Sequence, residues 1–294
     1  MNKVATIRLH RKRIRNRSRI VDLLLFVVLA SAGVFMAMPL VFVISNAFKP
    51  LDEIFLFPPK FFVRYPTLDN FVTLYHLMSS FWVPYTRYIF NTIFIAVVGT
   101  AGHVMLASMA AYPLAKRKFR GRSTLFTIVV LSLMFSGHVT AIPNYMTMSW
   151  LGLLDTYWAV IIPALGSSLG LFLMKQFMEQ MVPDTLLEAA RIDGCSEYRI
   201  FWGIAMPIVK PAWLTLIIFS FQGLWGSGGT GKIYIYSEQL KTIDYALDQI
   251  LAGGIVRTGP SMAASLLMIS VPIAIFIISQ SNVIQTMSTS GMKD

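Results

Sequence analysis

Side chains suited to catalysis or to metal binding are few and scattered in this sequence. The four histidines and the single cysteine, Cys195, show none of the spacings of a metal site, and one cysteine cannot form an internal disulfide. The acidic residues lie mainly in polar stretches between long apolar runs, so no paired carboxylates are placed for acid–base chemistry. We therefore expect no catalytic residues, no bound metal and no cofactor. His103 and His138 fall in or near apolar runs, where a polar side chain either packs against another helix or lines a path.

One glycine-rich stretch imitates a phosphate-binding loop. Gly226 is followed after four residues by Gly231 and Lys232, but the next residue is Ile233, where that loop needs Ser or Thr. The hydroxyl that would bind magnesium is therefore missing, and the stretch follows an apolar run, not a β-strand. We interpret residues 226–232 as a flexible external loop with no role in ATP binding.

The most informative segment runs from residue 183 to residue 207. Pro183 and Asp184 open a helix, Thr185 and Glu188 have the spacing of a capping box, and Gly194 supplies a left-handed stop. A second short helix, residues 196–202, leads back to an apolar run. The pattern predicts a helix–glycine–helix elbow that projects from the protein.

The composition of this elbow indicates a surface that inserts into a partner. Ala189 and Ala190 would leave the first helix flat and small, which suits a cleft. Glu188, Arg191 and Asp193 would provide charges that pair there. The alternative is an amphipathic surface helix on which Glu188 acts only as a cap.

The rest of the chain has the composition of a membrane protein. Of 294 residues, 55% are hydrophobic and only 13% are charged, with a mean hydropathy of +0.63. A chain so poor in charge cannot cover a water-facing surface. Six segments are long and apolar enough to span a bilayer: residues 21–45, 86–114, 123–145, 157–178, 206–226 and 262–283.

Lysine and arginine partition sharply between the segments that join these spans. With both termini on one side, 18 of the 25 basic residues lie on that side and 7 on the other. By the positive-inside rule both termini are cytoplasmic, as six spans require. The sequence divides into a basic cytoplasmic tail (1–20), a first span (21–45), a long external loop (46–85), a core (86–283) and a second tail (284–294). We interpret the basic tail as an anchor to lipid headgroups, and we expect no nucleic-acid partner.

The elbow resembles the EAA loop of binding-protein-dependent ABC importers. In that family Glu-Ala-Ala is followed after three residues by Gly, and about a dozen residues later by an apolar residue and Pro. The matching positions are Glu188, Ala189, Ala190, Gly194 and Pro207. Asp193 before the glycine and Pro211 after the motif are similar to the sugar-transporting branch. The whole chain looks like the second permease of a maltose-type pair, with closest likeness to permeases for complex oligosaccharides.

The resemblance implies a fold, partners and a mechanism. The fold would be all-α, with the six transmembrane helices of a type I ABC importer permease and a coupling loop over residues 179–205. The partners would be a second homologous permease, two copies of an ABC ATPase subunit and an extracytoplasmic solute-binding protein, in the bacterial cytoplasmic membrane. The chain would be a transport subunit and not an enzyme. The implied ATPase-coupling residues are Glu188, Ala189, Ala190, Arg191, Asp193, Gly194 and Pro207.

The expected cargo is an oligosaccharide. Aromatic faces stack on sugar C–H surfaces and neutral groups bond to hydroxyls, and such side chains occur near the fourth and fifth spans. They are Tyr157, Trp158, Gln222 and Trp225. The family often has Asn after this tryptophan, whereas this chain has Gly226, which weakens any transfer of substrate contacts.

Three alternatives remain at this point. A permease of the same type could carry another solute. A secondary transporter would need intramembrane carboxylates or broken helices, and the predicted spans lack such acids. A membrane-embedded enzyme would need clustered nucleophile, base or metal ligands.

Overall fold

A computed structural model of the chain describes residues 19–226 and 228–290. Most of the predicted basic tail and the last four residues of the predicted C-terminal tail lie outside these residues, as does Ser227. Every regular element in the described part of the chain is a helix. The all-α prediction is confirmed.

Four helical segments are long and apolar enough to cross a membrane. They are Ile20–Ala47, Tyr85–Lys116, Trp158–Met181 and Ile255–Gln280. The helices that make up these segments are α1 (Arg19–Ala47), α4 (Tyr85–Lys116), α7 (Trp158–Leu165) with α8 (Ser168–Met181), and α15 (Thr258–Ser290).

Two further candidate spans are bent pairs. Helices α5 (Arg122–Ser132) and α6 (Gly137–Trp150) meet at 109°, and the segment Glu197–Ile208 meets α12 (Lys210–Trp225) at 79°. If each pair is one span, the structure has the six spans expected from the sequence. Within the third of these spans, the helix breaks between Leu133 and Ser136.

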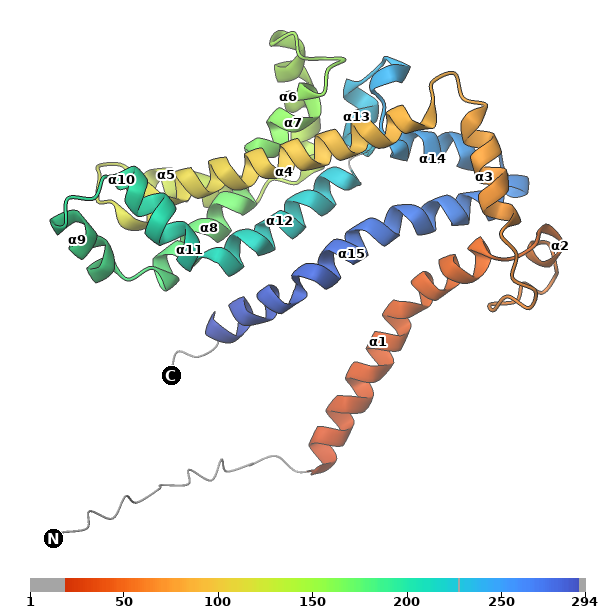
Figure 1. Cartoon of the computed structure of the whole chain (residues 1–294), viewed down its shortest axis with the longest axis horizontal. Coiled ribbons are helices and arrows are strands. Elements are labelled where there is room, and N and C mark those ends of the chain that lie inside the picture. Colours follow the sequence, from red (N-terminus) through yellow and green to blue (C-terminus); the bar gives the residue numbers. More distant parts are fainter. Residues whose placement is uncertain (1–18, 227, 291–294) are drawn as a thin grey trace.

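Helix α4 is the centre of the fold. It packs against α7, α8 and α12, and α12 packs in turn on α15 (Figure 1). One half of this core buries the first elbow helix against α4 and α12, and the other half packs α7 and α13 (Gly228–Tyr234) against the same helices. The C-terminal end of α1 lies against α15, whereas the N-terminal part of α1 diverges from the rest of the molecule (Figure 1).

The end of the molecule opposite the elbow is covered by short helices. They are α2 (Leu51–Ile54), α3 (Asp69–Ser79), α14 (Ile243–Leu251) and two 3-10 turns, η2 (Glu238–Leu240) and η3 (Ile255–Arg257). The amide of Asn70 donates to the carbonyls of Ala47 and Lys49, at 3.0 and 2.7 Å, and so fastens α3 to the end of α1.

The glycine-rich stretch differs from the prediction. It begins helix α13 and is not a loop throughout, and Lys232 on this helix pairs with Asp248 of α14. Asp155, in the loop between α6 and α7, fixes the chain just after α13. Its carboxylate accepts from the backbone N–H of Tyr236 and Ser237 at 2.9 and 2.8 Å, and also from the Ser237 hydroxyl. These hydrogen bonds, led by that of the hydroxyl, hold the pKa of Asp155 below its usual value.

Candidate functional site

The elbow is formed by helix α9 (Asp184–Ile192), Gly194 and helix α10 (Glu197–Ile200). Pro183 precedes α9 and contributes no side-chain cap, so the predicted capping box of Thr185 and Glu188 does not form. Gly194 has φ = 78°, which confirms the predicted left-handed stop. Beyond α10 the chain continues as a π-helix, η1 (Phe201–Ala205), and a short helix, α11 (Met206–Ile208), which contains Pro207.

One side of the elbow faces away from the protein. Glu188, Ala189 and Asp193 are exposed. Ile192 is 86% exposed and Tyr198 on α10 is 76% exposed, which is unusual for side chains of their size and polarity. The exposed side therefore combines a small residue, two large apolar groups and two acids, a composition suited to contact with another protein.

The other side of the elbow is part of the core. Leu187 and Ala190 are buried, with 1% and 7% of their surface exposed. Arg191 donates from Nε to Oε1 of Glu197 at 2.9 Å, and this bond raises the pKa of Arg191 above its usual value. The expectation that Ala190 forms the outer surface was therefore wrong, because α9 is amphipathic and turns it inward. The charge of Arg191 is paired with Glu197 of the same chain.

A cavity of about 730 Å³ lies between the broken helices, within the size range of ligand sites in proteins. It is open on one side and is lined by residues of α4, α6, α7, the break between α7 and α8, α8, α12 and α13. Polar side chains line it. They are His103, His138, Thr140, Asn144, Ser167, Ser220 and Tyr234. None of the described residues that line the cavity is an acid, a lysine or an arginine.

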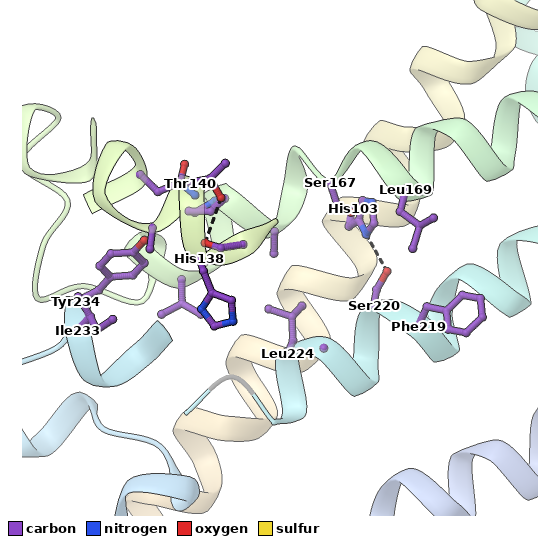
Figure 2. Close-up of a pocket in the computed structure, with 18 of the residues that line it drawn as sticks. His103, His138, Thr140, Ser167, Leu169, Phe219, Ser220, Leu224, Ile233 and Tyr234 are labelled. Atoms are coloured by element: carbon purple, nitrogen blue, oxygen red, sulfur yellow. Dashed lines mark hydrogen bonds between the residues drawn. The ribbon is translucent and has the colours of Figure 1, made fainter. Parts of the chain in front are cut away.

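The polar centre of this cavity is a histidine–serine pair. Nδ1 of His103 and Oγ of Ser220 are 2.7 Å apart, and Figure 2 shows the two side chains pointing toward one another from α4 and α12. His103 is only 4% exposed, and its Nε2 has no hydrogen-bond partner among the described residues. A Cβ at Gly170 would lie 2.2 Å from this Nε2, so only glycine lets α8 approach the imidazole.

The four predicted path residues do not meet in this cavity. Gln222 and Trp225 line a separate hollow of about 560 Å³ between α12 and α15. The indole of Trp225 donates to the carbonyl of Met268 at 3.0 Å, and the hydroxyl of Tyr157 donates to Oδ1 of Asn91 at 2.7 Å. Trp158 is exposed.

Sequence reasoning identified only part of the cavity lining. It left His103 and His138 open between packing and a path, and it missed Thr140, Asn144 and Ser220. The signal that could have found them is the pair Gly137 and Pro143 within one apolar segment, because such residues mark broken helices. No group of three or more His, Cys, Asp or Glu side chains suited to a metal occurs in the described part of the chain.

The fold, the elbow and the broken helices define a permease-type membrane protein. The chain belongs to the family described as binding-protein-dependent transport system inner membrane components, whose sequence profile matches residues 103–289. It is thus a membrane-embedded permease of an ABC importer.

Two curated relatives come from Bacillus subtilis. Protein LplC is 35% identical over 237 residues, which are 79% of this chain and 76% of that protein. The polygalacturonan/rhamnogalacturonan transport system permease protein YtcP is 31% identical over 245 residues, 80% of this chain and 79% of that protein. The arabinooligosaccharides transport system permease protein AraQ of Halalkalibacterium halodurans is 28% identical over 285 residues, 95% of this chain and 99% of that protein.

Two solved structures share the fold. A chain in the crystal structure of a bacterial ABC transporter involved in the import of the acidic polysaccharide alginate has a TM-score of 0.77 and 21% identity, covering 90% of this chain and 98% of that chain. A chain of the bacterial alginate transporter in complex with alginate pentasaccharide-bound periplasmic protein has a TM-score of 0.63 and 17% identity, covering 88% and 93%.

Proposed function

We propose that the chain forms half of the translocation path for an oligosaccharide. It would pair with a second homologous permease, with two copies of an ABC ATPase beneath them and an extracytoplasmic solute-binding protein that delivers the cargo. The names of the relatives support the cargo, because they specify arabinooligosaccharides and polygalacturonan or rhamnogalacturonan. The alginate transporter, which was crystallised with a sugar-bound periplasmic protein, supports the solute-binding partner.

The elbow is the proposed ATPase-coupling element. Glu188, Ala189 and Asp193 would contact a groove of the ATPase together with the exposed Ile192 and Tyr198. Gly194 would fix the angle between α9 and α10, and Pro207 would help to end the segment that leads into α12. Ala190 and Arg191 would support this surface from within and not touch the ATPase.

The proposed orientation places the elbow and both termini in the cytoplasm. The start of α1 and the end of α15 both lie toward the elbow's end of the molecule, away from α2, α3 and α14 (Figure 1). The basic residues that join α4 to α5 lie at the same end, as the positive-inside rule requires of a cytoplasmic loop.

The cavity is the proposed cargo path. Its polar lining, in which the described residues include no acid, lysine or arginine, suits the hydroxyl groups of a neutral or weakly acidic sugar, whereas a bound ion or amino acid would require a fixed counter-charge. Trp158 and Gln222, whose side chains are exposed, remain candidates for contact with cargo. Tyr157 and Trp225 would hold the helices around the path, since their polar hydrogens bond to other parts of the chain.

The observation that carries the proposal is an exposed elbow joined by its buried side to the helices that enclose an uncharged cavity. Cells that lack this chain should fail to grow on one oligosaccharide and grow normally on its monosaccharides. Glu188→Lys should abolish uptake, while Asp52→Lys at the opposite end of the molecule should not. Loss of uptake of an amino acid, a metal or phosphate, with every glycan still imported, would overturn the cargo assignment.

A further inference from the structure

The loop between α4 and α5 holds the elbow by several ion pairs. We call residues 116–122, which include the last residue of α4 and the first residue of α5, the basic loop; sequence reasoning assigned it only to membrane topology. Three of its basic side chains, Lys116, Arg117 and Arg122, each pair with a different acid. These acids are Glu179 before the elbow, Asp184 at its start and Glu197 at the start of its second helix.

The first two contacts fix the beginning of α9. Nζ of Lys116 lies 2.9 Å from Oδ1 of Asp184 and also donates to the carbonyl of Glu179 at 3.3 Å. The bond from Lys116 holds the pKa of Asp184 below its usual value. Arg122 pairs with Oε1 of Glu179 at 3.0 Å and Lys175 with Oε2 of the same carboxylate at 2.5 Å.

The third contact joins three parts of the chain at one carboxylate. Glu197 accepts from Nε of Arg191 in α9 and, at 3.1 Å, from the hydroxyl of Tyr112 in α4. It also pairs with Arg117 of the basic loop. Isolated surface ion pairs contribute little, but a network that shares one half-buried acceptor restrains every element that donates to it.

Helix α4 connects this carboxylate to the cavity. Tyr112 and His103 lie on the same helix, nine residues or about 14 Å apart. A displacement of the elbow would therefore reach the cavity without any intervening loop.

Accepting the proposed coupling role of the elbow, we propose that Glu197 is a positioning residue for transport. It joins α9, α10 and the basic loop to α4, so that the elbow and α4 move as one body when the ATPase moves the elbow. Neutralising Glu197 would weaken one of the connections between the elbow and α4, which also share an apolar core, so that less of the elbow's movement would reach the helix that lines the cavity.

The first test measures whether the parts move together. In the assembled importer with Cys195→Ser, spin labels at Lys118→Cys in the basic loop and Arg199→Cys on α10 report one distance. We expect the same narrow distance distribution without nucleotide and with trapped ATP, and a broad one after Glu197→Gln. A wild-type distance that changes with nucleotide, or an unchanged distribution in the variant, would overturn the proposal.

The second test measures oligosaccharide transported per ATP hydrolysed in proteoliposomes. Glu197→Gln, which keeps the shape of the side chain, should lower this ratio at least about five-fold, the lower end of typical coupling between sites. Arg117→Gln should lower it in the same direction, and Glu197→Asp should restore part of it. Arg120→Gln is the matched control, since this exposed residue of the same loop forms no ion pair among the described residues. An equal ratio in Glu197→Gln and Arg120→Gln would contradict the role of Glu197.

The two proposals fail in different ways. If the label on α10 is not immobilised when the ATPase is added to the wild-type permease pair, the elbow is not the ATPase-coupling element. The distance between the two labels would still test whether Glu197 fastens the elbow to the basic loop.

Discussion

The left-handed backbone at Gly194 predicts a graded response to substitution. No atom lies within 4 Å of the place that a Cβ would occupy, so a new side chain would meet open space and only the backbone would be strained. A left-handed conformation costs an L-residue about 1–2 kcal/mol, least for Asn and most for a β-branched residue. That cost lowers the population of the native elbow relative to other conformations by a factor of about 5–30.

Binding-protein-stimulated ATP hydrolysis and uptake by the reconstituted importer measure this effect. Activity should fall in the order Gly194→Asn, Gly194→Ala, Gly194→Val, while the permease still assembles in the membrane. Gly203→Ala is the matched control, because Gly203 is exposed, lies in the same segment, has open space around it and has a helical backbone. Equal activity in Gly194→Val and Gly203→Ala would refute the reasoning from φ.

Three further predictions concern other parts of the chain. Gly170→Ala should destabilise the protein by about 1–3 kcal/mol, because the new Cβ would overlap the buried imidazole of His103. Gly223→Ala, which lines the same cavity, should leave the stability unchanged, and equal melting temperatures of the two variants would contradict the packing. Asp155→Asn should lower the melting temperature at neutral pH. Because the pKa of Asp155 is lowered in the fold, the carboxylate's contribution to stability is complete above the usual aspartate pKa and disappears as the pH falls through the lowered value. A difference in melting temperature that does not depend on pH would contradict this. In a Cys195→Ser background, an impermeant thiol reagent applied to intact cells should label Trp82→Cys but not Arg120→Cys, and the reverse pattern would invert the orientation.

Composition and motif spacing predicted the class of fold and the elbow. Hydropathy finds spans because a bilayer requires about 20 apolar residues in a row, and this constraint is local. Gly194 was predictable for the same reason, since a left-handed residue after a short amphipathic helix depends only on nearby sequence.

The bends and the cavity could not be predicted in this way. Residues 123–145 are apolar enough on average for a span, so hydropathy alone does not detect the bend of 109° between α5 and α6. Trp225 was predicted to contact the sugar because aromatic side chains stack on sugars. Its indole N–H instead donates to the carbonyl of Met268, 43 residues away. The inward side of Ala190 and the partners of Arg191 likewise depend on contacts with helices far away in the sequence.

The central claim is that the exposed side of the elbow binds an ATPase. The most direct measurement is cross-linking in the assembled importer with Cys195→Ser, from a cysteine at Ile192 to a cysteine placed in the ATPase groove. We expect a cross-linked permease–ATPase product from Ile192→Cys, and none from Trp82→Cys at the other end of the molecule. An ATPase that copurifies with the permease but forms no cross-link from Ile192→Cys or from Tyr198→Cys would contradict it.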